Sequence, residues 1–189
     1  DSQVRVYQTI ADSDFTITNI SVKESTKNNL ARVDYDGSVS SLLVEPERTN
    51  EVAYSEDFSD SSWIKVNTTI TSNYGTAPNG TNTSTRIQYT DASAYLIRTI
   101  TSGDYTASTY VKGTSGQVVK FGVGSNVGQG GEFTLNGEWQ RIENYSVART
   151  NIFYSSLGGN TATDFQIWGA QAEEATYATS YIPTDGSTV

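Results

Sequence analysis

Side chains that can stack on rings or bond to hydroxyl groups recur at every second position in two stretches of the chain, 105–112 and 165–171. Alternate side chains of a β-strand point to the same side, so each set would share one face. An aromatic ring offers a flat apolar surface to a sugar ring, and amide, ammonium and hydroxyl groups bond sugar hydroxyls. The pattern predicts a ligand-binding sheet face that also draws on the stretch 95–100. The candidate ligand-binding residues are Tyr95, Tyr110, Lys112, Gln166 and Trp168.

Structural roles stay open for these residues. Tyr110 and Lys112 could be ordinary exposed residues of a strand, and Trp168 could lie in the core instead of on a ligand face. Tyr95 is considered together with Arg98 as coming from a strand beside Tyr110. Strand alternation puts Tyr95 and Arg98 on opposite faces, so only one of them can line the site.

The composition excludes several catalytic and metal-binding classes. The 189 residues include no cysteine, histidine or methionine. Without cysteine there is no disulfide or thiol chemistry, and without histidine there is no Ser-His-Asp or Cys-His nucleophile and no usual zinc site. The glycine-rich stretch 122–131 lacks the Lys-Ser/Thr end of a phosphate-binding loop. Carboxylates are numerous, but nothing singles out the pair that a glycosidase needs. We therefore expect no enzyme activity.

The charge balance restricts the partners. The chain carries 12 Lys and Arg against 21 Asp and Glu, a formal net charge of −9. Such a chain repels nucleic acid and anionic membrane surfaces. It would also repel a strongly anionic polysaccharide, unless a local basic cluster outweighs the overall field. No apolar run is long enough to span a bilayer. We expect no nucleic-acid partner and no membrane insertion.

Short alternating runs separated by Gly, Asn, Asp and Ser predict an all-β fold. The expected strands lie at 31–35, 41–44, 64–71, 86–90, 95–100, 105–112, 118–123, 133–135, 138–147, 152–157, 165–171 and, at a terminal edge, 181–183. A turn at Gly103 and Asp104 is expected to separate two of these strands. The sequence therefore predicts a two-sheet antiparallel β-sandwich of jelly-roll type over residues 31–189, preceded by an N-terminal extension, residues 1–30.

Four sequence segments resemble parts of the β-sandwich modules of bacteriophage tail fibres, tail spikes and related prophage proteins. They are LLVEPERTN at 42–50, YSEDFSDSSWIK at 54–65, EWQRI at 138–142 and IWGAQAEEATYATSYIPT at 167–184. What the resemblance implies is a carbohydrate-binding-like jelly roll on a phage adhesion or depolymerase protein. Trp63 and Trp139 lie inside segments that modules of unrelated specificity share, so core or corner roles are expected for both.

The resemblance also implies a place for a structural ion. Glu56 and Asp57 stand where similar jelly-roll carbohydrate modules hold calcium, and Glu173 from the end of the chain could complete the shell. Calcium takes about six to eight oxygen ligands from carboxylates and carbonyls. The candidate metal ligands are therefore Glu56, Asp57 and Glu173. The alternative is that these acids cap turns and strand ends.

The expected function is non-catalytic recognition of a polysaccharide or cell-surface glycan by a module of a phage tail protein, located in the virion tail or outside the cell. Aromatic rings would stack on the sugars, and a homotrimeric parent protein would add avidity. Two alternatives stay open. One is a spacer or trimerisation element without a ligand. The other is a polysaccharide-degrading domain, which the missing histidine disfavours without excluding it, since a lyase could use Tyr with Lys or Arg. It would show an acid pair or a Tyr-Arg-Lys cluster in one groove.

Overall fold

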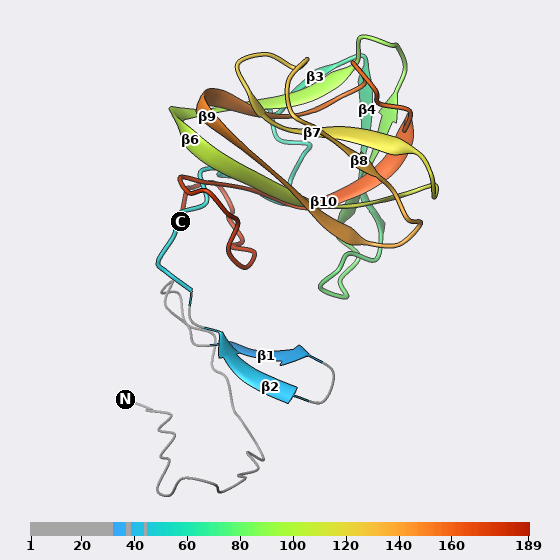
Figure 1. Cartoon of the computed structure of the whole chain (residues 1–189). Helices are drawn as coiled ribbons and strands as arrows, with labels where there is room; N and C mark the ends of the chain where they lie inside the picture. Colours follow the sequence, from blue (N-terminus) through green and yellow to red (C-terminus); the bar gives the residue numbers. More distant parts are fainter. Residues whose placement is uncertain (1–31, 37–38, 44) are drawn as a thin grey trace, which may run out of the picture.

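The computed structural model of the protein describes residues 32–36, 39–43 and 45–189, and these residues form strands and loops but no helix (Figure 1). Strands β1 (Arg32–Asp36) and β2 (Val39–Leu43) pair antiparallel in a two-stranded sheet of their own, a hairpin that the sequence predicts. The described residues thus offer no helix that could cross a bilayer. The expected N-terminal extension lies outside the described residues, and its boundary stays a prediction.

The other eight described strands form one antiparallel sheet. Its order is β4-β5-β10-β6-β9-β7-β8, and β3 pairs with β6 outside this path. The strands are β3 (Ile64–Val66), β4 (Thr68–Gly75), β5 (Ser84–Tyr89), β6 (Tyr95–Gly113), β7 (Val118–Gly124), β8 (Gly131–Thr134), β9 (Gln140–Ser155) and β10 (Asp164–Glu173). The predicted all-β antiparallel fold is confirmed.

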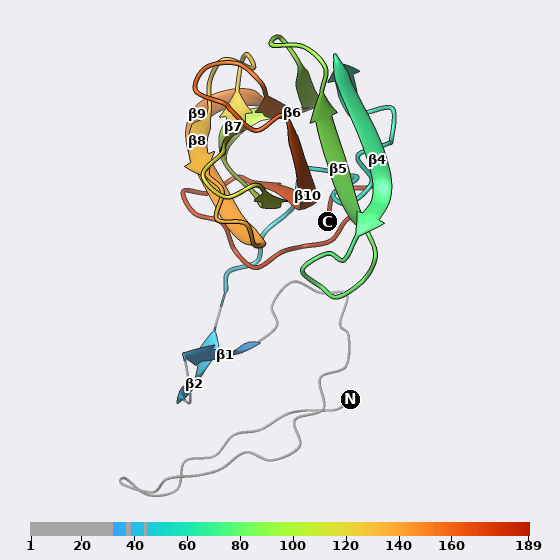
Figure 2. The ribbon, with the colours of Figure 1, turned by 90° about the vertical axis from the view of Figure 1, so that its right-hand side faces the viewer.

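The sheet curls until its two halves face each other (Figure 2). The first half-sheet holds β4, β5, β10, residues 105–113 of β6 and residues 140–146 of β9. The second half-sheet holds β3, residues 95–99 of β6, residues 151–155 of β9, β7 and β8. The hydroxyl of Tyr154, in the second half-sheet, donates to Thr109 Oγ1, in the first, at 2.7 Å. The sandwich is therefore one continuous sheet folded over a common core.

The β6–β9 hairpin bends where it passes from one half to the other. Its pairing register shifts on both sides of Gly103. Asp104 accepts a hydrogen bond from the Ala148 N–H at 2.7 Å, and Ala148 has a φ of 53°, in the left-handed region. The predicted turn at Gly103 and Asp104 is wrong, because β9 bends together with β6 and the chain needs no reversal there. For the same reason, two predicted strands merge into β6 and two into β9.

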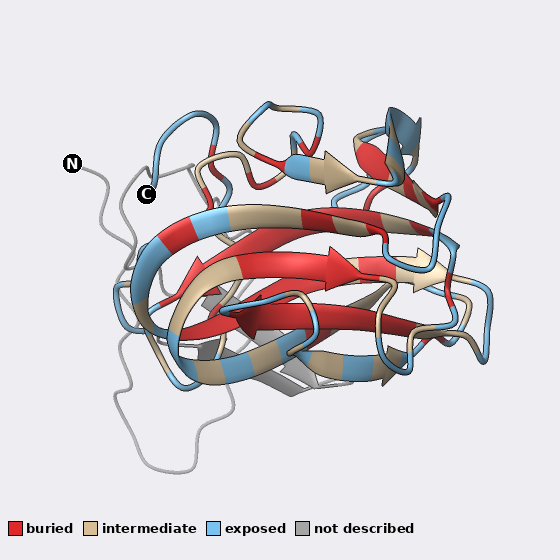
Figure 3. Ribbon diagram, turned by 90° about the horizontal axis from the view of Figure 1, so that it is seen from above, coloured by how far each residue is buried: buried red, intermediate tan, exposed pale blue. Residues whose placement is uncertain are grey.

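Apolar side chains from both halves fill the core, and buried residues run along the inner strands (Figure 3). The rings of Phe58, Trp63 and Tyr154 pack with centroids 5.0 to 6.3 Å apart. Trp63 is 1% exposed, so its predicted core role is confirmed. Burying one such side chain contributes about 1.5–3 kcal/mol. Trp139 is half-buried, and its indole N–H donates to a main-chain carbonyl at 3.0 Å, as expected of a corner residue.

The end of the chain, residues 174–189, forms no strand, although the sequence predicts one at 181–183. This closing segment makes one isolated bridge, between Tyr54 and Asp185. The N–H groups of Ile182 and Thr184 donate to side chains, at 2.7 and 2.9 Å, and not to a neighbouring strand. Side-chain acceptors thus replace the ladder that the prediction required.

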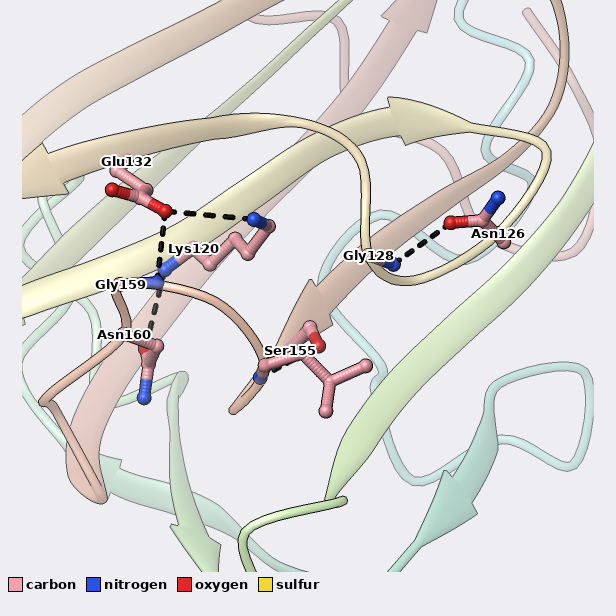
Figure 4. A network of polar contacts seen from close by, with 8 residues as sticks. Lys120, Asn126, Gly128, Glu132, Ser155, Gly159 and Asn160 are labelled. Atoms are coloured by element: carbon pink, nitrogen blue, oxygen red, sulfur yellow. Dashed lines mark hydrogen bonds and ion pairs between the residues drawn. The ribbon is translucent and has the colours of Figure 1, made fainter.

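On the outer side of the second half-sheet, Lys120 on β7 and Glu132 on β8 meet the loop that carries Gly159 (Figure 4). The side chain of Lys120 is 8% exposed and pairs with Glu132 at 3.5 Å, and the Gly159 N–H donates to the same carboxylate at 2.9 Å. The glycine-rich loop after β7 packs on Phe153, which is fully buried outside the main core cluster. A Cβ at Gly130 would lie 3.0 Å from this ring, and its φ of 89° also favours glycine.

Candidate functional site

The outer face of the first half-sheet carries polar side chains in rows that cross the strands. Arg86 on β5 lies opposite Gln166 on β10, and Gln166 lies opposite Lys112 on β6. Phe165 and Ile167, which flank Gln166, belong to the core. Strand alternation therefore places Gln166 on the outer side. We call Arg86, Gln166 and Lys112 the open row.

A hollow of about 480 Å³ lies over the open row. The hollow is a shallow depression that is widely open to solvent. The ring of Tyr74, 46% exposed, stands in its wall. Other polar groups at the hollow come from Asp164, Thr114 and Ser115. The hollow thus combines a solvent-facing ring with charged, amide and hydroxyl groups.

Arg86 is held on two sides. Its Nε and Nη2 donate to the two oxygens of Asp164 at 2.8 and 2.5 Å, and its guanidinium carbon lies 4.9 Å from the centre of the Tyr74 ring. The hydrogen bonds of this pair are the main cause that lowers the pKa of Asp164 and raises the pKa of Arg86. Gln88 adds a donor to Asp164 at 3.3 Å. A planar donor–acceptor unit therefore lies beside the exposed ring.

The other two residues of the open row keep groups for a ligand. Lys112 Nζ lies 3.3 Å from Glu138 Oε2, and the Glu138 side chain is 81% exposed. An ion pair this exposed contributes about 0–1 kcal/mol, so a ligand can replace Glu138 at little cost. The Ser84 hydroxyl has one proton and lies within hydrogen-bond distance of both the Gly75 carbonyl, at 2.8 Å, and Gln166 Oε1, at 2.9 Å. The Gln166 amide thus brings a carbonyl oxygen and an NH₂ group to the hollow.

A second row lies two residues along the same strands, and the closing segment covers it. Trp168 on β10 lies opposite Tyr110 on β6, and Tyr110 lies opposite Arg141 on β9. We call these three residues the sealed row. Trp168 is 4% exposed, and its ring centroid lies 5.5 Å from that of Tyr110 and 4.5 Å from that of Tyr181 in the closing segment. Its indole N–H donates to Glu56 at 3.1 Å.

Buried hydrogen bonds hold the closing segment in place. Glu173 is fully buried, and its carboxylate accepts from Gln171 Nε2 at 2.6 Å and from the N–H and hydroxyl of Thr179 at 2.9 and 2.5 Å. Arg141 donates to the Thr179 carbonyl at 2.6 Å and to the Ser108 hydroxyl at 2.8 Å. Hydrogen bonds to charged groups are about twice as strong as neutral ones. The closing segment is therefore held firmly over the sealed row.

The structure divides the predicted ligand-binding residues among three places. Lys112 and Gln166 line the hollow, whereas Tyr110 and Trp168 belong to the sealed row. Tyr95 lies in the second half-sheet, opposite residues of β3 and β9. The expectation that Tyr95 comes from a strand beside Tyr110 is wrong, because both residues belong to the single long strand β6.

The three candidate metal ligands have protein partners. Glu56 accepts from the Trp168 indole and the Tyr181 hydroxyl, both at 3.1 Å, and Asp57 accepts at 2.9 Å from the backbone N–H two residues later. Glu173 is enclosed as described above. Within residues 45–189, no three Asp, Glu, His or Cys side chains are grouped so as to hold a metal. These contacts are those of capping and turn residues, and the calcium site stays a prediction.

Three residues of the hollow were not singled out from the sequence: Tyr74, Arg86 and Asp164. Tyr74 falls in a stretch predicted as a loop, where Asn73 has a φ of 54° and the β4–β5 register shifts. The alternation of polar and apolar residues at 86–89 indicates that Arg86 points away from the core, and this pattern could have identified it. No local pattern links Arg86 to Asp164, which lies 78 positions away.

Comparisons with known proteins give two distant structural similarities. No protein-family model and no curated protein sequence matches the chain. The enzymatically active domain of tailspike protein 4 of bacteriophage CBA120 is similar with a TM-score of 0.41 and 14% identity, over 65% of this chain and 21% of that one. The CBM22-1 xylan-binding domain of Paenibacillus barcinonensis Xyn10C is similar with a TM-score of 0.44 and 11% identity, over 69% of this chain and 94% of that one. The chain thus spans about a fifth of the tailspike domain. Similarity at this level shows neither a shared ligand nor a shared activity.

Proposed function

We propose that the protein binds carbohydrate without cleaving it, and that the hollow over the open row is the binding site. The observation that carries this proposal is the combination of an exposed Tyr74 ring with the donors and acceptors of Arg86, Asp164, Lys112 and Gln166 around one hollow. An apolar ring face beside fixed polar groups matches the two kinds of surface of a pyranose.

The mechanism is stacking plus hydrogen bonding. The guanidinium of Arg86 covers one face of Tyr74 and fixes the ring, so a sugar would pack on its remaining exposed surface. Lys112 would exchange Glu138 for a sugar oxygen, and the Gln166 amide would donate to a second one. Few side chains need to reorder, which keeps the entropic cost of binding low.

The resemblance of the sequence to tail-fibre and tail-spike modules supports a parent protein in the virion tail, with binding to a polysaccharide or cell-surface glycan outside the cell. A single open hollow favours weak binding at each site. A homotrimeric parent would raise the effective affinity by presenting three sites together. Size-exclusion chromatography with light scattering on the purified chain tests the trimer.

The direct test is a glycan-array screen with the wild-type protein and two tyrosine variants. Tyr74→Ala should reduce binding to the recognised glycan about twofold to tenfold, because an aromatic contact is worth about 0.5–1.5 kcal/mol beyond its buried area. Tyr145→Ala is the matched control, since Tyr145 is similarly exposed at 42% and does not line the hollow. A wild-type blank on the array, or equal loss in both variants, would count against a carbohydrate site here.

Burial of the sealed row favours a second candidate, a structural element without a ligand. Trp168 is buried and Tyr110 is half-buried under the closing segment, as this alternative expects. It predicts a blank array from a folded protein together with a stable oligomer, so the same two measurements separate it from the carbohydrate-binding function.

A polysaccharide lyase is favoured by one further observation, since Tyr74, Arg86 and Lys112 meet in a single hollow. Arg86 is committed to Asp164, however, and a paired guanidinium is a weaker partner for a substrate carboxylate. Incubation with uronate polymers decides between the two functions. A rise in ultraviolet absorbance from unsaturated sugar ends supports cleavage, and unchanged absorbance and polymer length count against the lyase.

A further inference from the structure

We propose that the hollow takes a neutral polysaccharide, with hydroxyl groups but no carboxylate or sulfate, and this inference rests on the proposed carbohydrate-binding function. Both cations that line the hollow are paired: Arg86 with Asp164, and Lys112 with Glu138. The charges of these four side chains sum to zero, while the whole chain carries −9. Lys112 is the one of these two cations that a ligand can free at little cost. The hollow therefore lacks the local basic cluster that an anionic polymer would need, and the overall field repels such a polymer.

An anionic sugar could form a bidentate pair with the Nε and Nη2 donors of Arg86 only by displacing Asp164. Two parallel N–H···O bonds at 2.8 and 2.5 Å join the pair, and Gln88 donates to the same carboxylate. Bidentate bonds between charged groups are the strong kind. Displacement would leave Asp164 with Gln88 as its donor and without its cation. Replacing the Asp164 carboxylate by a sugar carboxylate therefore gives no net gain in binding free energy at Arg86.

A sugar hydroxyl both donates and accepts, and the hollow offers both kinds of partner side by side. Asp164 accepts, while Arg86 Nη1 takes no part in the bonds to Asp164 and can donate. The Gln166 amide NH₂ is a further donor at the hollow, and the Gln166 oxygen lies beside the Ser84 hydroxyl. Adjacent hydroxyls of one ring can therefore bond the arginine and the aspartate at the same time, without breaking their pair. Thr114 adds a hydroxyl that can act either way.

The test is binding of the wild-type protein to two sets of immobilised polymers. The neutral set is dextran, mannan, galactan and β-glucan, and the anionic set is polygalacturonate, alginate, hyaluronan and heparin. We expect binding to a member of the neutral set alone. Its affinity should change less than about twofold between 50 and 500 mM NaCl, because no net charge is screened. Binding confined to the anionic set, or weakened severalfold by salt, would overturn the inference and leave carbohydrate binding standing. A blank on both sets would overturn the proposed function itself.

A charge variant sharpens the test. Asp164→Asn leaves Arg86 without its counter-charge, so affinity for polygalacturonate should rise about fivefold over wild type, the effect of one partly exposed charge contact. Glu174→Gln changes the net charge by the same amount at an exposed residue outside the hollow, and should leave this affinity unchanged. Equal binding by the two variants would contradict the inference. If Asp164→Asn melts early, the salt dependence of the wild-type protein decides alone.

Discussion

The open row and the sealed row lie two residues apart on β6 and β10, the two strands they share, yet they face different surroundings. Gln166 and Lys112 line a hollow open to solvent, whereas Trp168 and Tyr110 lie under the closing segment. Both rows point away from the core, and both hold aromatic or polar groups suited to a ligand. The difference arises from residues 174–184, which cross one row and not the other.

This contrast shows that the side of a sheet on which a residue lies does not decide its role. Trp168 has the chemistry of a sugar platform, but its N–H is bound to Glu56 and its ring to Tyr181. Tyr74 has less surface to offer, but it stays 46% exposed beside Arg86. We therefore assign stability to the sealed row and binding to the open row.

The largest effect should follow from removing the centre of the sealed row. Trp168→Ala should lower the free energy of unfolding by about 3–5 kcal/mol, because it leaves a cavity under the closing segment and removes one of the two donors to Glu56. Urea titration followed by circular dichroism measures this. Trp139→Ala, at a half-buried corner, is the comparison and should cost less. Equal stability of Trp168→Ala and wild type would mean that the row is not sealed.

The next largest effect on stability should come from the hydrogen bonds that hold the closing segment. Glu173→Gln places an NH₂ group against the donors of Gln171 and Thr179, and should cost about 1–3 kcal/mol for buried donors left without acceptors. Glu174→Gln is the matched control, one residue along and exposed, and should change stability by less than about 0.5 kcal/mol. Thermal melting of the two variants side by side gives the answer. Equal melting temperatures would contradict a tight cover.

The Arg86–Asp164 pair should persist in mild acid. Only a weak pair would be lost just below neutral pH. The pKa of Asp164 is lowered from its ordinary value of 3.8, chiefly by its bond to Arg86. An acid whose pKa is lower in the folded state than in the unfolded state stabilises the fold fully at pH values above its unfolded pKa. This stabilisation is lost as the pH falls through the folded pKa. Glycan affinity should therefore be constant from about pH 7 to pH 5 and fall severalfold only below 3.8. A loss already complete at about pH 5 would contradict the pairing.

A smaller effect is expected at the exposed end of the open row. Lys112→Ala removes one donor from the hollow and should weaken glycan binding about threefold, with no change in the melting temperature, because its pair with Glu138 is exposed. Isothermal titration with the recognised glycan measures this. Glu138→Ala, which frees the lysine, should not weaken binding. The opposite order of the two variants would mean that Glu138, and not Lys112, contacts the sugar.

The smallest effect is expected from metal removal. Glu56, Asp57 and Glu173 are bonded to separate groups of the protein, so chelation with EDTA should leave both the melting temperature and glycan binding unchanged. A clear rise in melting temperature on adding calcium to chelated protein would restore the calcium site that the resemblance implies.

The alternation of residues predicted the fold class and most strand positions, because the core of a sandwich imposes a period of two on every strand. It also turned Gln166 and Trp168 to the correct side. Beyond Trp168 the pattern fails: Ala170 faces the core although alternation groups it with Trp168. Gly169, with a φ of 64°, sits at the register shift that causes this change.

The rest of the site depends on contacts that no local pattern encodes. The Arg86–Asp164 pair joins two strands that are far apart in sequence, and the cover over Trp168 is made by a segment predicted as an edge strand. Tyr74 was not predicted because the end of β4 is irregular: Asn73 has a positive φ, and the β4–β5 register shifts there. Sequence alternation thus gives the side of the sheet, and tertiary packing decides which part of that side meets solvent.

The most direct test of this division is an NMR titration of the folded domain with an oligosaccharide of the recognised glycan. We predict amide shift changes at Tyr74, Arg86, Lys112 and Gln166, around the hollow, and unchanged amides at Gln171, Thr179 and Tyr181 in and under the closing segment. Shift changes confined to the closing segment and the sealed row, with the hollow unaffected, would contradict the assignment of binding to the open row.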